Sequence, residues 1–307
     1  MNIIKDQRPG GVIISPGCRL ACLFCGGHRK TPISEIKNQE IKIYKNLQYF
    51  KKNGVERISI SGSDPIEYDN LIELVEYIKK EGFQEIDLST HGEKFSDKSF
   101  TKKLITAGIN KLRIPIYGSR AEIHDSITRT PGSFKKVVLG IKNLIENHPE
   151  VKIQISTLIF RENKDDLLNI VDFLNKLKIK DNYFSIPCLT EESSSFYIPF
   201  KELGPLVKKL YKYALKINSQ TRFREIPFCI FGELNTVNIE NMGLPPNLGK
   251  YNQPPDIVKT EIPDLPSYRL KKKVAMCKLC KASDYCHGFF VNDINKFGTG
   301  KIQPIKK

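Results

Sequence analysis

Apolar runs and amphipathic patterns alternate along residues 11–215 of this 307-residue chain. Short apolar or alternating runs predict strands at 11–15, 57–61, 85–90, 111–117, 151–160 and 183–187. Apolar residues spaced three or four positions apart predict helices at 34–52, 70–80, 96–107, 133–146 and 165–177. In the second of these helices, Leu71, Leu74, Val75 and Ile78 share one face. Strands and helices in this alternation are typical of parallel βα units.

Six such units predict the fold class. Right-handed crossovers would wind them into a curved parallel sheet, so we predict an α/β fold, a partial (β/α)6 barrel of the TIM type. After about Asn218, prolines interrupt the chain and the periodicity fades. We therefore predict a barrel domain at 1–217 and a small, irregular domain at 218–307. A metal site would compensate for the poor apolar core of the second domain.

Composition and charge limit the partners and the cellular location that we expect for this protein. The net charge is +15, but the basic residues are mostly lysines spread over the predicted helices. Only 269–273, with the sequence Arg-Leu-Lys-Lys-Lys, is a dense run, and such runs are usually solvated faces rather than nucleic-acid sites. No apolar run approaches the roughly 20 residues that span a bilayer. Because the N-terminus also lacks a signal-like segment, we expect a cytoplasmic protein without a membrane partner.

Three cysteines follow the first predicted strand at CxxxCxxC spacing: Cys18, Cys22 and Cys25. Three thiolates in so short a loop can hold three irons of a cubane iron–sulfur cluster and leave the fourth iron without a protein ligand. Structural sites usually close all four positions, so an open position indicates chemistry. A zinc loop completed by His28 is the alternative.

The remaining cysteines lie towards the other end of the chain. Cys277, Cys280 and Cys286 form a CxxCx5C run, Cys229 precedes them, and Cys188 stands alone at the end of the sixth predicted strand. In a cytosolic protein such groups are metal ligands more often than disulfides. Four of these cysteines would suit either a cluster or a structural zinc ion.

The triplet, with Phe24 just before its last cysteine, resembles the signature of the radical SAM superfamily. In that family the open iron of a 4Fe–4S cluster binds the amino and carboxylate groups of S-adenosylmethionine. Residues 60–65, Ile-Ser-Gly-Ser-Asp-Pro, resemble the family's GGEP motif, whose backbone contacts the cofactor's amino group. The resemblance implies cofactor binding by Gly62, Ser63, Asp64 and Pro65. An ordinary strand-to-helix turn is the alternative.

Two further segments resemble cofactor-binding parts of the family. Ser89 and Thr90 end the third strand, where hydroxyl groups often bond the cofactor in relatives. Residues 116–134 resemble the stretch after the fourth strand, and there Thr128 or Arg129 would contact the cofactor's carboxylate.

Two histidine-containing segments near these motifs have simpler explanations. His124 and Asp125 are interpreted as a helix-end pair that fixes the following loop. His91 could carry a proton near neutral pH, but a lone histidine is more often structural.

The C-terminal set resembles the auxiliary-cluster domains of SPASM or twitch type. The resemblance implies one auxiliary 4Fe–4S cluster held by Cys229, Cys277, Cys280 and Cys286, which would relay electrons or shape the substrate pocket. Cys188 would donate a hydrogen atom to a substrate radical, as in some radical SAM epimerases. It could instead replace Cys229 as a ligand, or it could be a buried small side chain.

The resemblance also implies a reaction. The reduced cluster would cleave S-adenosylmethionine to methionine and a 5′-deoxyadenosyl radical, which takes a hydrogen atom from a substrate. We expect an oxygen-sensitive enzyme with a reductant such as ferredoxin or flavodoxin as partner. The auxiliary domain favours a peptide or protein side chain as substrate, while the basic composition leaves RNA, a nucleotide or a small metabolite as alternatives. A non-catalytic iron–sulfur or zinc protein is the alternative from another class.

Overall fold

The computed structural model describes residues 9–25, 29–187, 195–231, 239–240, 271–284, 286, 288–300 and 302–306. The chain divides into two compact units. The first unit comprises residues 1–115, 124–154 and 252–259, and the second comprises 116–123, 155–251 and 260–307. Each unit is considered separately below.

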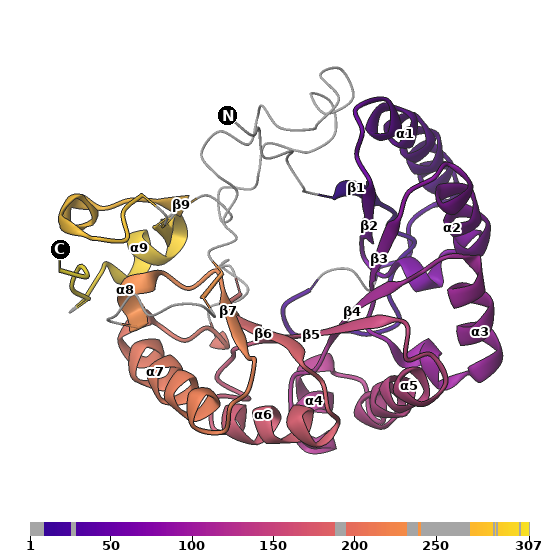
Figure 1. Cartoon of the computed structure of the whole chain (residues 1–307). Coiled ribbons are helices and arrows are strands. Elements are labelled where there is room, and N and C mark those ends of the chain that lie inside the picture. Colours follow the sequence, from indigo (N-terminus) through magenta and orange to yellow (C-terminus); the bar gives the residue numbers. More distant parts are fainter. Residues whose placement is uncertain are drawn as a thin grey trace. The chain divides into compact units, whose positions relative to one another are not determined.

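The first unit is built on four parallel strands. They are β1 (Gly10–Ile13), β2 (Arg57–Ser61), β3 (Glu85–Ser89) and β4 (Lys111–Pro115), and each pairs with the next along the chain. Four helices lie along one side of these strands (Figure 1): α1 (Ile33–Lys52), α2 (Leu71–Lys80), α3 (Lys98–Ala107) and α5 (Ser133–Asn147). Short helices follow β2 and β3, namely η1 (Pro65–Glu67) and η2 (Glu93–Ser96), and α4 (Ala121–Thr128) precedes α5.

Side chains along most of these strands alternate between buried and less buried positions, as expected of a sheet with helices packed on one face. In β2, Ile58 and Ile60 are fully buried, whereas their neighbours in the strand are only half-buried. The predicted apolar face of α2 is confirmed, because all four of its residues are buried. In α1 the apolar Ile41 does not belong to the buried face and is 56% exposed. It lies two positions before the buried Ile43, and two residues rotate a helix by roughly 200°.

The second unit continues the parallel arrangement. Its strands include β6 (Asp181–Ser185), β7 (Arg222–Arg224) and β8 (Ile239–Glu240), which pair in parallel, and β5 (Lys152–Leu158) precedes them. Its helices are α6 (Leu167–Lys176), α7 (Phe200–Lys216) and α8 (Phe228–Phe231). Tyr213 of α7 donates a 2.6 Å hydrogen bond to Asp172 of α6. A hairpin of β9 (Lys271–Lys272) and β10 (Phe289–Phe290) encloses η6 (Ala275–Leu279) and leads into α9 (Val291–Phe297).

The predicted fold class is confirmed, with one correction to the strand series. The strands are ordered β1 to β8 along the sheet, and within the described residues β1 does not pair with β8, so the barrel is partial. The expectation that the sixth strand ends the series is wrong, because β7 and β8 extend it. β7 has three residues, of which only Phe223 is buried, so it is too short to produce a periodic pattern.

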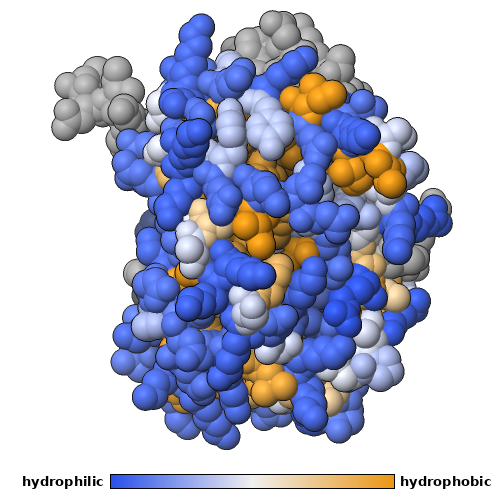
Figure 2. Space-filling view, turned by 90° about the vertical axis from the view of Figure 1, so that its right-hand side faces the viewer, coloured by the Kyte–Doolittle hydropathy of each residue, from blue (hydrophilic) through white to orange (hydrophobic). Residues whose placement is uncertain are grey.

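The helix-covered side of the first unit is mainly hydrophilic, and its apolar residues occur as separate spots (Figure 2). The exposed large apolar residues of this unit are Ile13, Ile33, Ile41, Tyr44 and Leu139. Scattered single residues of this kind are normal on soluble surfaces. Among the described helices, none combines the length and apolar character that crossing a bilayer requires.

Candidate functional site

The loops after β1, β2 and β3 emerge at one edge of the first unit's sheet, because parallel strands end on the same side. The cysteine loop, residues 14–25, follows β1, and Gly62–Pro65 follows β2. Ser89, Thr90 and His91 follow in the same position after β3. The sequence motifs of this unit therefore share one rim.

Ser63 ties the cysteine loop to the β2 loop. The Gly17 N–H donates to Ser63 Oγ, and this hydroxyl donates to the Gly17 carbonyl, both at 2.8 Å. The Ser63 N–H donates to Ser15 Oγ at 3.2 Å. Among the described residues Ser63 is not one of those with positive φ, so a side chain is tolerated where the family motif has glycine.

Gly62 cannot carry a side chain. A Cβ built on it would lie 1.8 Å from the Ile14 carbonyl oxygen and 2.6 Å from the Ile14 carbonyl carbon. Both are backbone atoms at the end of β1, so they cannot rotate away. Gly62 is itself exposed, which leaves its backbone accessible at the rim.

The three thiols of the cysteine loop are poised to bind metal. Burial raises the pKa of Cys18 to about 11, and burial together with the neighbouring Cys18 and Cys25 raises that of Cys22 to about 12. Metal binding must therefore displace protons from these thiols. Cys18 Sγ also lies within 4.8 Å of a ligand atom of Asp64 and of His91, so these three side chains form a group that could hold a metal ion.

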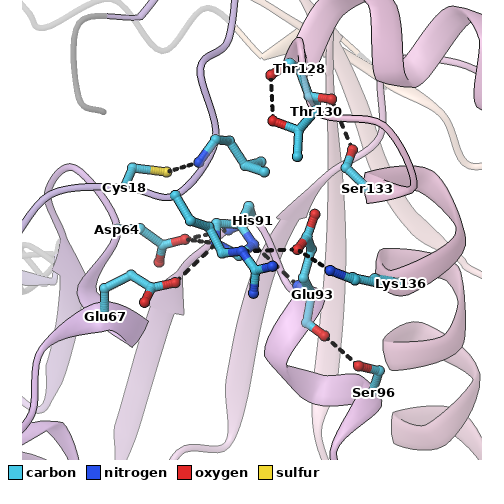
Figure 3. A network of polar contacts seen from close by, with 12 residues as sticks. Cys18, Asp64, Glu67, His91, Glu93, Ser96, Thr128, Thr130, Ser133 and Lys136 are labelled. Atoms are coloured by element: carbon cyan, nitrogen blue, oxygen red, sulfur yellow. Dashed lines mark hydrogen bonds and ion pairs between the residues drawn. The ribbon is translucent and has the colours of Figure 1, made fainter. Parts of the chain in front are cut away.

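Asp64 and His91 join the ends of β2 and β3 (Figure 3). The Asp64 carboxylate accepts from the N–H groups of Ile66 and His91, each at 3.2 Å, and lies 2.8 Å from His91 Nε2. The Glu93 N–H donates to His91 Nδ1 at 3.2 Å, which favours the neutral ring, although Asp64 and Glu67 favour the charged one. Both ring nitrogens face protein groups, which supports the structural interpretation of His91.

The hydroxyls predicted at the end of β3 are present at the rim but are engaged within the protein. Ser89 Oγ accepts from Arg113 Nη1 at 3.1 Å. Thr90, which is 6% exposed, accepts through Oγ1 from the Gly92 N–H at 3.3 Å.

The two residues predicted to contact the cofactor's carboxylate differ in exposure. Thr128 is fully buried, and its Oγ1 lies 2.8 Å from Ser133 Oγ (Figure 3). Arg129 is exposed and has a φ of 52°. Only the Arg129 side chain is therefore available to a ligand in this arrangement.

The interpretation of Asp125 as part of a loop-fixing pair is confirmed. Its carboxylate accepts from the N–H groups of Gly132 and Phe134 at 2.6 and 2.7 Å and from Ser133 Oγ at 3.2 Å. These bonds hold the first turn of α5 against the end of α4.

Sequence reasoning missed a buried ionic group beside the cysteine loop. Glu93 is 2% exposed, and its Oε2 lies 3.3 Å from Arg19 Nε and 3.9 Å from Lys136 Nζ. Arg19 lies between the first two cysteines, and Lys136 lies on α5. The sequence carried no signal for it, because glutamate is usually exposed and only the folded structure shows that Glu93 is buried.

The second unit brings the C-terminal cysteines together. Cys229, Cys277, Cys280 and Cys286 line one pocket, together with Phe228, Lys273, Met276, Ser283, Phe289 and Pro304. Burial raises the pKa of Cys229 to about 12, and the three other thiols contribute.

The basic run near this pocket is structural over its described residues. Lys271 pairs with Glu225 Oε2 at 2.5 Å and is 7% exposed. Lys272 donates to Asn295 and Lys273 to the Ser283 carbonyl. Arg269, Cys188 and His28 lie outside the described residues.

Comparison with known proteins decides the family. Residues 12–174, more than half of the chain, match the family described as the radical SAM superfamily. The chain belongs to the radical SAM superfamily. Membership implies a 4Fe–4S cluster and S-adenosylmethionine, and the free thiols of Cys18, Cys22 and Cys25 together with the exposed Gly62 fit these groups.

Curated relatives of this radical SAM protein include enzymes that act on a nucleotide. It is 26% identical over 215 residues to a probable GTP 3′,8-cyclase of Methanocaldococcus jannaschii, covering 69% of each chain. It is 27% identical over 174 residues to the GTP 3′,8-cyclase of Limosilactobacillus fermentum, covering 55% of this chain and half of that protein.

Solved structures confirm the fold. SuiB of Streptococcus suis, bound to S-adenosylmethionine, has a TM-score of 0.61 and 15% identity, covering 98% of this chain and 77% of SuiB. The enzyme anSMEcpe, bound to AdoMet and the Cp18Cys peptide, has a TM-score of 0.55 and 16% identity, covering 69% and 62% of the two chains.

Proposed function

We propose that this radical SAM enzyme uses a cluster held by Cys18, Cys22 and Cys25 to cleave S-adenosylmethionine reductively. When bound, the cluster and cofactor supply a 5′-deoxyadenosyl radical that abstracts a hydrogen atom from a substrate. The observation that carries the proposal is the cysteine loop after β1, fastened to the β2 loop through Ser63. A strong one-electron reductant is required, and ferredoxin or flavodoxin would supply it in the cell.

The chain's own residues would position the cofactor. Gly62 is exposed at the rim beside the cysteine loop, and its lack of a side chain permits the close approach of the β1 end. Ser89 and Thr90 border the same rim. Arg129 is the better candidate for the cofactor's carboxylate, because Thr128 Oγ1 is buried against Ser133.

We also propose an auxiliary 4Fe–4S cluster in residues 218–307, ligated by Cys229, Cys277, Cys280 and Cys286. Four thiols line one pocket, which satisfies a closed ligand set. A structural zinc ion bound by the same four cysteines is the alternative. Cys188 remains a proposed hydrogen-atom donor.

The substrate proposed first is a peptide or protein side chain, on the strength of the auxiliary site. A nucleotide is the second candidate, because the curated relatives named above are GTP 3′,8-cyclases.

The reaction is tested with anaerobically reconstituted protein, dithionite and S-adenosylmethionine. Wild type should form 5′-deoxyadenosine, whereas the triple Cys→Ala variant of 18, 22 and 25 should form none yet retain about four irons per chain. As the matched control, Cys277→Ala with Cys280→Ala should lose about four irons and keep the triplet's cluster. Absence of 5′-deoxyadenosine from the wild type would falsify the proposal.

The substrate class is tested by stimulation of the same reaction. A tryptic peptide mixture that accelerates 5′-deoxyadenosine formation, with GTP inactive, would support the peptide proposal. Acceleration by GTP, with a changed nucleotide seen by mass spectrometry, would overturn it in favour of the second candidate.

A further inference from the structure

Glu93 is a buried anion with few partners. It is 2% exposed, and neither carboxylate oxygen has a hydrogen bond within the described part of the chain. A buried carboxylate is costly unless cations compensate for it. The two cations near it are Arg19, 3.3 Å away, and Lys136, 3.9 Å away. Figure 3 shows Glu93 directed between His91 and Lys136.

The cations come from different elements. Arg19 follows Cys18 directly and precedes Cys22, so its side chain extends from the middle of the cysteine loop. Lys136 lies on the first turn of α5. Glu93 therefore links the cysteine loop to the β3 rim and to α5 by charge.

Other contacts hold the same loop before the first cysteine and after the second. Ser63 bonds the backbone of Gly17, before the first cysteine. The Leu23 N–H donates to the Ile127 carbonyl of α4 at 2.9 Å, after the second. Of these three attachments, only the Glu93–Arg19 contact acts between the first and second cysteines.

We propose that Glu93 is a positioning residue that clamps the cysteine loop through Arg19. The proposal rests on the proposed function, because the loop is taken to hold the cluster. Glu93 fixes Arg19, and Arg19 fixes the path of the chain between Cys18 and Cys22. The pair also places one negative and one positive charge beside the cluster. Removing the charge of Glu93 therefore makes the local charge more positive, whereas removing the charge of Arg19 makes it more negative.

The opposite charges give a test that a purely structural role would not pass. A redox titration of full-length, anaerobically reconstituted protein measures the reduction potential of the cluster. The readout is the EPR signal that changes on addition of S-adenosylmethionine. Glu93→Gln removes a negative charge and should raise the reduction potential. Arg19→Gln removes a positive charge and should lower it. The matched control Glu122→Gln, at a side chain that is 77% exposed, should leave it unchanged.

Loop position is tested independently by site-resolved alkylation of the iron-free full-length protein. Glu93→Gln and Arg19→Gln should each accelerate alkylation of Cys18 and Cys22 about tenfold, which corresponds to roughly 1.4 kcal/mol of easier opening. The double variant should react no faster than either single variant, because the two side chains act as one clamp. The four thiols of the second unit serve as the internal control and should not change.

Three results would overturn the clamp: shifts of the two potentials in the same direction, unchanged alkylation of Cys18 and Cys22, or equal acceleration of all the thiols. If the wild type has no signal that responds to S-adenosylmethionine, the proposed function fails. The alkylation pattern still decides whether Glu93 clamps the loop.

Discussion

We predict that His124, which lies near the cysteine loop, lowers the stability of the first unit as the pH falls. The residue lies on α4, is 3% exposed and packs against Phe134 with ring centroids 5.6 Å apart. Burial lowers the pKa of His124 from 6.5 to about 4, although Asp125 opposes the shift. The same helix provides the Ile127 carbonyl that accepts from Leu23 of the cysteine loop. Charging His124 would therefore loosen one attachment of that loop.

The sign and size follow from proton linkage. Above pH 6.5 the histidine is neutral in both the folded and the unfolded chain, so it causes no pH dependence. Between pH 6.5 and 4 the unfolded chain binds a proton that the folded chain does not, so the free energy of unfolding falls. At pH 5 the loss is about 2 kcal/mol, from 1.36 kcal/mol per unit over 1.5 units. Below about pH 4 this contribution is constant.

The assay compares wild type with His124→Phe, which keeps an aromatic ring and removes the titration. The chain has no tryptophan, so urea unfolding is followed by far-ultraviolet circular dichroism at pH 8 and pH 5. The stability of wild type relative to the variant should fall by about 2 kcal/mol between the two conditions. Phe134→Leu keeps His124 but thins the packing over it, so this variant should lose less stability than wild type between the two pH values. A constant difference between wild type and His124→Phe would refute the reasoning.

Three further predictions concern the loops and the second pocket. Gly62→Ala should abolish iron binding by the cysteine triplet, measured as iron per chain, because its Cβ would collide with the Ile14 carbonyl. Ser63→Ala should accelerate loss of that iron to a chelator, because two 2.8 Å hydrogen bonds of about 1 kcal/mol each are removed. Cys229→Ser should lower the iron content of the second unit and raise the reactivity of Cys277 towards alkylating agents.

Controls sharpen these three experiments. Gly82→Ala adds a side chain at a positive φ with nothing within 4 Å, so it should retain iron and lose roughly 1 kcal/mol of stability. Equal iron loss in Gly82→Ala and Gly62→Ala would contradict the steric argument. For Ser63, Ser59→Ala on β2 should release iron at the wild-type rate. One zinc per chain, with no iron in the second unit, would contradict the auxiliary-cluster proposal.

Periodic segments were predictable because their burial pattern is local. In α2 and β2 the residues expected to be buried are buried, since one face of each element must be covered by its neighbour. The pattern was insufficient at Ile41, where an apolar residue faces solvent, and at β7, where three residues are too few. The cysteine triplet was found from its spacing and Gly62 from the resemblance of residues 60–65 to a family motif, because in both cases the chemistry is concentrated in a few adjacent positions.

By itself the sequence determined the order of the βα units, the family and the thiols available to metals. Only the tertiary structure decided which distant residues meet. Cys229 joins Cys277, Cys280 and Cys286 in one pocket although many residues separate them. The hydroxyl of Thr128 is buried against Ser133, and Glu93 meets Arg19. Local periodicity specifies which face of an element is covered, whereas these contacts depend on which loops the folded sheet brings to the same edge.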